Sequence, residues 1–353
     1  MSNFLYVCLQ DENKIAAFSM DAATGQLTRQ ADFPAMGGPS VLAISLDRRV
    51  LYVGHRNEPS ISSFRIDQGG GTLTPLGAIA PPHAPTFLAL DRTGAWMLSA
   101  YYQGGFVAVH RIAADGSVVD EPVEWLATEV GAHAVQTDPT NRFAFVPHIA
   151  RLNDNVLEPQ RDNPGPNMIA QFRFDAGTGR LHPNSPFRIE PAERSGPRHL
   201  CFHPSQNLVF FSNEQGCGIT GYRLDPAHGT LTAEQTVSSL PPGHAVRNTC
   251  SQIHLTPSGR FLYVANRGHN SIAGFSVDAS TGRMALVGHV PTEAVPGAFA
   301  LDPLGKFLFA AGTASGRLAA YRIDQETGVL IPTATYEVGR RPAALLLTDP
   351  AFA

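Results

Sequence analysis

One sequence phrase recurs along the chain, and this repeat limits the possible folds more than any other feature. Each copy holds a proline position, an apolar strand, a turn of the Asp-Pro-x-Gly-Arg type and an aromatic strand, as in GPRHLCFHPSQNLVFFSNE and CSQIHLTPSGRFLYVANR. Two more strands follow each copy, joined by turns such as ASTGRM and QETGVL. Short β-branched or aromatic runs bounded by Gly, Pro, Asp and Asn are typical of β-strands. The repeat therefore predicts units of four antiparallel strands.

The residue after each proline position marks seven such units, spaced by 46, 47, 65, 54, 45 and 46 residues. These anchor residues are Ser40, Thr86, His133, Arg198, Gln252, Gly297 and Ala343. The last unit ends after one strand and the first lacks its opening strand, so the N- and C-terminal strands are expected to complete one blade. Such closure removes the open sheet edge. We therefore predict an all-β fold, a seven-bladed β-propeller of four-stranded antiparallel blades, with residues 1–353 as one domain.

Composition supports an all-β chain and argues against two kinds of partner. Hydrophobic residues make up 43% and charged residues 16%, and the 33 Gly and 28 Pro suit many tight turns. The formal charge of −4, with Lys and Arg scattered singly, predicts no nucleic-acid partner. No apolar run is long enough to span a membrane, so no membrane partner is expected.

The first residues and the cysteines indicate a cellular compartment. The opening MSNFLYVCLQ has neither the basic segment nor the apolar run of a secretory signal. The four cysteines show no C-x-x-C spacing and no disulfide framework. We therefore expect free thiols and a cytoplasmic protein, as a monomer or weak homo-oligomer.

Polar residues gather at one mouth of the predicted channel. The first strand of each blade lines the channel, and alternating strand direction brings the start of strand one and the end of strand two to the same mouth. The strand-two ends are Gln10, Arg56, Tyr102, His148 or Ile149, Glu214, Arg267 and Thr313. Three neighbouring blades then contribute His133 with His148, Arg198 with Glu214, and Gln252 with Arg267. Strand alternation places His254 one layer below Gln252 on the same inward face.

Extra chain length points to the same blades. The insertion at about 149–167 is rich in Asp, Asn, Pro and Arg and is a possible lid over the channel. A shorter insertion, PPGHAVRN, brings His244 and Arg247 near the same rim. Either loop could instead be a solvated decoration.

Two arginines, a carboxylate and histidines in one cleft suit ester or lactone chemistry. They offer fixed positive charge for an anionic substrate or an oxyanion, and groups that move protons near neutral pH. The chain has no G-x-S-x-G, Walker, H-E-x-x-H or G-x-G-x-x-G motif of the required context. A hard cation held by Asn213, Glu214, Asn266 and Gln252 is an alternative, which the neighbouring arginines oppose.

Several segments carry a family resemblance. GPRHLCFHP (196–204), SNE (212–214), QIHLTPSGRFLYVANR (252–267) and the terminal ATYEVGRRP resemble the propeller lactonases, a family that includes bacterial 6-phosphogluconolactonase and the fungal 3-carboxymuconate lactonizing enzyme. The resemblance covers essentially the whole chain. It implies a lactonase or cycloisomerase without metal or cofactor, whose catalytic residues fall on His133, Arg198, Glu214 and Arg267. The chain differs from the phosphogluconolactonases at His148 and the following insertion, and at Gln252, where Asp is common.

We therefore expect hydrolysis of a sugar-acid lactone that is anionic or polyhydroxylated. Arg198 and Arg267 would hold the anionic group or carbonyl oxygen, and Glu214 or His133 would take a proton from water. The residues expected to bind substrate are His148, Gln252, His254, Arg56 and Tyr102. Two alternatives remain: a cycloisomerase acting on a carboxylated, muconate-like diacid, and a non-enzymatic propeller that binds a protein on its rim.

Overall fold

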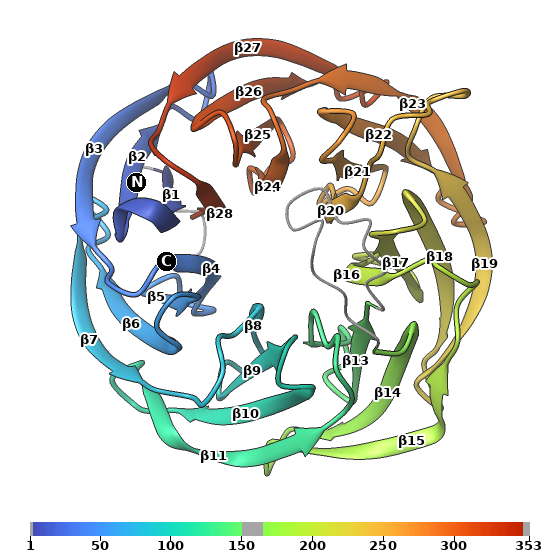
Figure 1. The fold of residues 1–353 in the computed structure, drawn as a ribbon, viewed down its shortest axis with the longest axis horizontal. Helices are drawn as coiled ribbons and strands as arrows, with labels where there is room; N and C mark the ends of the chain where they lie inside the picture. Colours follow the sequence, from blue (N-terminus) through green and yellow to red (C-terminus); the bar gives the residue numbers. More distant parts are fainter. Residues whose placement is uncertain (1–2, 150–164, 349–353) are drawn as a thin grey trace.

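The strands form a ring of sheets around a central channel (Figure 1). The computed structural model describes residues 3–149 and 165–348, and within these ranges it has seven sheets of four strands each. Every pairing within a sheet is antiparallel, as in β1 (Asn3–Leu9) with β2 (Lys14–Met20). The predicted seven-bladed β-propeller is therefore confirmed.

Each blade runs outward from an inner strand at the channel to an outer strand at the rim of the ring. In this order, the first two blades are β28 (Pro342–Leu347), β1, β2, β3 (Leu27–Pro34), and β4 (Pro39–Ile44), β5 (Val50–His55), β6 (Ser60–Ile66), β7 (Leu73–Ile79). The third and fourth are β8 (Phe87–Leu90), β9 (Trp96–Tyr101), β10 (Phe106–Ile112), β11 (Val118–Ala127), and β12 (Gln136–Thr137), β13 (Phe143–His148), β14 (Met168–Asp175), β15 (Arg180–Ile189). The fifth and sixth are β16 (Pro197–Phe202), β17 (Leu208–Asn213), β18 (Gly218–Asp225), β19 (Thr230–Ser238), and β20 (Cys250–Leu255), β21 (Phe261–Asn266), β22 (Ser271–Val277), β23 (Met284–Pro291). The seventh is β24 (Pro296–Leu301), β25 (Phe307–Gly312), β26 (Arg317–Ile323), β27 (Leu330–Glu337), and a short 3₁₀ helix, η1 (Gln10–Glu12), follows β1.

The two ends of the chain close the ring. β28 pairs with β1 in the register Leu5↔Leu347 to Cys8↔Ala344. This pairing supplies the inner strand that the first blade lacks in sequence, so the predicted closure is confirmed. It also covers a sheet edge that would otherwise present unpaired backbone groups.

Burial follows the position of each strand in its blade. The second strands, such as β17 and β21, are buried at every residue because a neighbouring blade covers each face. The outermost strands, such as β27, alternate between half-buried and exposed residues over most of their length. An aromatic residue recurs in the third strand of five blades and is buried in each: Phe64, Phe172, Tyr222, Phe275 and Tyr321.

A glycine turn joins neighbouring blades. Gly71, between β6 and β7, has a φ of 68°, and a Cβ there would lie 2.4 Å from Cδ1 of Phe4 in the preceding blade. Its carbonyl also accepts a hydrogen bond from the Tyr6 hydroxyl at 2.8 Å. A side chain at this position would be strained and would clash, so glycine is required for tight contact between the blades.

Three further expectations have different outcomes. The four cysteines are free thiols, as predicted. No helix in the described part of the chain is long and apolar enough to cross a membrane. The possible lid at about 149–167 falls mainly on residues outside the described ranges.

Candidate active site

β-Bulges place the anchor residues in the channel. In β16, Pro197 pairs with Asn213 and Leu200 with Phe211, so Arg198 and His199 together lie opposite a single residue of β17. The inner strands β4, β20, β24 and β28 have a register shift at the same place. A bulge changes the direction in which side chains point. Proline is tolerated at the first residue of a strand, where its missing N–H does not interrupt the ladder. Five of the seven inner strands therefore have a bulge at the anchor residue, all at the same mouth.

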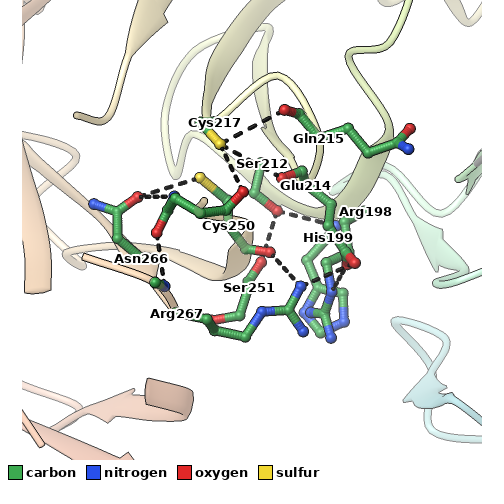
Figure 2. A network of polar contacts seen from close by, with 12 residues as sticks. Arg198, His199, Ser212, Glu214, Gln215, Cys217, Cys250, Ser251, Asn266 and Arg267 are labelled. Carbon is green, nitrogen blue, oxygen red and sulfur yellow. Dashed lines mark hydrogen bonds and ion pairs between the residues drawn. The ribbon is translucent and has the colours of Figure 1, made fainter. Parts of the chain in front are cut away.

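A carboxylate joins two arginines at this mouth. Nε of Arg198 donates to Oε2 of Glu214 at 2.8 Å, and Nη2 of Arg267 donates to Oε1 of Glu214 at 2.9 Å (Figure 2). Nη2 of Arg267 also donates to the carbonyl oxygen of Cys250 at 2.9 Å. The Glu214 and Arg267 side chains are only 4% and 3% exposed, and Arg198 is 12% exposed. Because these side chains are largely buried, the charge-assisted hydrogen bonds hold both guanidinium groups in fixed positions.

Two buried serines brace the same strands. The backbone N–H of His199 donates to the Ser212 hydroxyl at 3.2 Å, and that hydroxyl donates to the Ser251 carbonyl at 2.9 Å (Figure 2). The Ser251 hydroxyl donates to the Pro296 carbonyl at 2.8 Å. This chain of bonds links three neighbouring blades directly behind the arginines, so the site rests on rigid elements.

His133 and His199 are held in the neutral form. Their rings lie edge to face, with centroids 5.1 Å apart. Burial, followed by the positive charge of Arg198, keeps the pKa of both imidazoles well below the usual range. Nδ1 of His133 and Nε2 of His199 are buried and have no hydrogen-bond partner within the described residues. Orphaned polar atoms of this kind in a native protein point to a site that a ligand or water completes.

Gln252 and His254 form the next part of the wall. Oε1 of Gln252 accepts a hydrogen bond from the backbone N–H of Phe299 at 2.9 Å, which ties β20 to β24. The His254 ring packs edge to face on Phe299 with centroids 4.7 Å apart. Burial lowers the pKa of His254 to about 4, so this imidazole is also neutral.

A cavity of about 850 Å³ runs along the channel. All seven anchor residues line it, from Ser40 round to Ala343. Of the nine predicted site residues, the cavity lining includes His133, Arg198, Arg267, Gln252, His254 and Arg56. The volume lies in the range of small-molecule sites.

The other three predicted site residues lie outside the lining. Glu214 sits behind the two arginines that it binds. Tyr102 lies beside the His133 ring, with centroids 5.8 Å apart. His148 is fully buried, with Nδ1 at 3.0 Å from the Val146 carbonyl oxygen and Nε2 at 3.0 Å from the Thr128 hydroxyl. The structure thus gives His148 partners within the fold and does not bring it to the cavity with His133.

Among the lining residues that were not predicted from the sequence, His199 and Arg341 lie at the same mouth as the predicted site. His199 follows Arg198 directly, and simple strand alternation would turn it away from the channel, whereas the bulge turns it inward. Arg341 also lines the cavity, just before Pro342 of β28. The paired arginines of GRRP were a visible signal for Arg341, but nothing in the sequence marks the inward turn of His199.

The side chains considered for a hard cation all have hydrogen-bond partners within the fold. The Asn213 amide donates to the Thr220 hydroxyl at 2.9 Å, and the Asn266 amide donates to the Ser239 carbonyl at 2.9 Å. Neither asparagine lines the cavity. Over residues 3–149 and 165–348, no group of three His, Cys, Asp or Glu side chains is arranged to hold a metal ion.

The channel mouth of this propeller brings together two guanidinium groups, a buried carboxylate and neutral imidazoles. Enzymes that open esters or lactones use groups of these kinds to stabilise the oxyanion and to transfer protons. The family described as "Lactonase, 7-bladed beta-propeller" matches residues 4–346. The chain belongs to this family, and its enzyme class is that of a lactonase.

Two curated relatives agree with this assignment, and two solved structures share the fold. A 6-phosphogluconolactonase of Pectobacterium carotovorum is 35% identical over 97% of each chain. That of Pectobacterium atrosepticum is 33% identical over 99% of this chain and 100% of the relative. Among solved structures, a periplasmic gluconolactonase of Pseudomonas aeruginosa superposes with a TM-score of 0.85 at 24% identity, covering 99% of each chain. A protein from Lactobacillus plantarum superposes with a TM-score of 0.86, also at 24% identity, covering 99% of this chain and 100% of that one.

Proposed function

We propose that this lactonase hydrolyses a sugar-acid lactone, 6-phosphogluconolactone or a related aldonolactone, at the channel mouth that holds Arg198 and Arg267. The observation that carries the proposal is the shared carboxylate of Glu214, which fixes two guanidinium groups beside the neutral imidazole of His133. The curated relatives at 33–35% identity are 6-phosphogluconolactonases, which supports a sugar-acid substrate.

In the proposed mechanism, Arg198 and Arg267 bind the lactone carbonyl oxygen and stabilise the oxyanion that forms when water attacks the carbonyl carbon. His133 takes the proton from the attacking water. The bond from water oxygen to carbonyl carbon forms, the bond from that carbon to the ring oxygen breaks, and the His133 imidazolium returns the proton to the ring oxygen. The product acid then ionises and releases one proton.

Glu214 acts through the arginines in this scheme. Both of its carboxylate oxygens already accept hydrogen bonds from Arg198 and Arg267. Of the two bases considered from the sequence, His133 is therefore the one that lines the cavity and has a nitrogen without a partner in the described residues.

The test mixes metal-stripped enzyme with freshly made lactones and measures proton release with a pH indicator. The lactones are 6-phosphogluconolactone, gluconolactone, galactonolactone and carboxylated butenolides. Acid should appear above the spontaneous rate, and Arg198→Gln should lower kcat by about 10² to 10³. A matched control is Arg223→Gln, because Nε of Arg223 binds Oε1 of Glu234 at the same 2.8 Å but on the outer, exposed strands.

No acceleration on any lactone by folded protein would overturn the proposal. A product of unchanged mass would point instead to a cycloisomerase. We further propose a cytoplasmic monomer or weak homo-oligomer that meets its substrate as a dissolved small molecule.

A further inference from the structure

A second positively charged region lines the cavity, on the blades that face the candidate active site. Arg56 follows β5 and Arg341 precedes β28, and both line the same cavity as Arg198 and Arg267. Figure 1 places β28 and β4 across the ring from β16 and β20. The channel mouth thus has guanidinium groups on two opposite walls.

Gln10 ties the two arginine segments together. Its backbone N–H donates to the Arg341 carbonyl at 3.1 Å, and its side-chain Nε2 donates to Oδ1 of Asn57, next to Arg56, at 3.3 Å. The Arg56 N–H donates to the Gly38 carbonyl at 2.9 Å. Gln10 itself lines the cavity. Arg56 and Arg341 therefore belong to one braced rim rather than to two independent loops.

The described lining of the cavity carries more guanidinium groups than carboxylates. Among the described residues that line the cavity, Asp302 is the only one with a carboxylate. It follows β24 and so lies at the opposite mouth. At the mouth that holds Arg56 and Arg341, Glu214 offsets part of the charge of Arg198 and Arg267 from behind. Over the described residues, the lining thus holds five arginines and one aspartate, although the whole chain has a net charge of −4. An excess of guanidinium groups in a cleft attracts anions.

We propose that Arg56 and Arg341 bind an anionic group of the substrate at a distance from the reacting carbonyl, and so make the enzyme prefer ionised lactones to neutral ones. This inference rests on the proposed function. The shared chemistry is a permanent anion with several acceptor oxygens, which planar guanidinium groups bind in a bidentate manner. A phosphate monoester is the principal candidate, and a carboxylate is the other source.

The experiment compares kcat/KM for 6-phosphogluconolactone and gluconolactone, which differ only in the phosphate. Arg56→Gln and Arg341→Gln should each lower the ratio of the two values by at least about tenfold, mainly through KM for the phosphorylated substrate. The double variant should lower it further. Arg340→Gln is the matched control, because Arg340 precedes Arg341 but does not line this cavity.

Inorganic phosphate provides a readout without turnover. It should raise the Tm of the native chain, and the double variant should lose this shift. If the variants lower kcat/KM equally for both lactones, the proposal is wrong. If phosphate binding depends on Arg56 and Arg341 but no lactone is hydrolysed, the anion site stands and the proposed function fails. A preference for carboxylated butenolides that the variants abolish would support the site and name a carboxylate as its ligand.

Discussion

The carboxylate of Glu214 and the guanidinium group of Arg267 form a buried ion pair between two neighbouring blades, with 2.9 Å between Oε1 and Nη2. Because the same carboxylate also binds Arg198, one negative charge holds two positive charges that would otherwise repel each other. This pairing sets the position of the groups that we propose to contact the lactone carbonyl.

Replacing Glu214 with Gln should damage both activity and stability. The amide keeps the size of the side chain but removes the negative charge that both guanidinium groups share. We expect kcat/KM to fall by about 10² and the free energy of unfolding to fall by about 3 kcal/mol, measured by proton release and by denaturant titration. The control Glu234→Gln removes the carboxylate of the exposed pair with Arg223 and should change stability by less than about 1 kcal/mol. Equal effects of the two substitutions would contradict the role given to Glu214.

The histidines His133 and His148 should differ sharply in what they do. His133→Gln should lower kcat by at least about 10² and leave Tm nearly unchanged, because a general base is lost from the cavity. His148→Gln should lower Tm, because His148 bonds to Thr128 and Val146 inside the fold. Its effect on kcat/KM should be small at a temperature where the variant is folded. A selective loss of activity in His148→Gln would instead place His148 in the substrate site.

The acid limb of the pH–rate profile should lie well below pH 6.5. Burial and the charge of Arg198 keep the pKa of His133 low, so the neutral base persists as the pH falls. Log kcat/KM should stay flat from pH 7 to below pH 6, measured in initial rates corrected for spontaneous hydrolysis. Arg267→Gln removes a nearby positive charge, so it should raise the pKa of His133 and move the acid limb to higher pH. An acid limb near pH 6.5 that Arg267→Gln does not move would exclude His133 as the base.

Thermal stability should fall as the pH drops from 7 to 5. Burial lowers the pKa of His55, His148 and His254 to about 4 in the folded chain, whereas the unfolded chain takes up protons near pH 6.5. Since the unfolded state binds more protons, each of these histidines should cost about 2 kcal/mol of stability at pH 5. Calorimetry at a series of pH values checks this, and His148→Gln should show a smaller drop in Tm between pH 7 and 5. A Tm that is constant or rises toward pH 5 would show that these imidazoles are charged in the fold.

Chelation should leave the activity unchanged. The groups that face the proposed carbonyl position are guanidinium groups, which repel a divalent ion and already supply positive charge. Dialysis against EDTA and re-addition of Mg²⁺, Ca²⁺ or Zn²⁺ should therefore change kcat by less than twofold or so. Loss of activity with EDTA that one of these ions restores would require a metal in the mechanism.

Much of the site could be predicted because the repeat is local. The proline phrase, the turn and the following strand recur within each unit, so Arg198, Gln252 and the other anchors could be aligned without knowing how the blades pack. All seven anchors line the cavity. The inward face of His254, one layer below Gln252, also followed from alternation along a single strand.

Other features depend on contacts between segments far apart in the chain. The bulge in β16 turns His199 toward the cavity, although an unbroken strand would point it away from the Arg198 side. His148 is the last residue of β13, at the mouth where it was predicted. Its ring nitrogens nevertheless bond to Thr128 and Val146, so its side chain does not line the cavity. Arg341 reaches the same cavity as Arg56 because β28 closes the ring beside β4.

The sequence by itself determined the number of blades, the closure by β28 and β1 and the identity of the channel-lining positions, because strand period and turn chemistry act over a few neighbouring residues. Only the tertiary structure decided which of those side chains contact one another. Whether Glu214 acts as a base or as the partner of Arg198 and Arg267 depends on how adjacent blades dock. That docking sets distances and burial, which no local pattern contains.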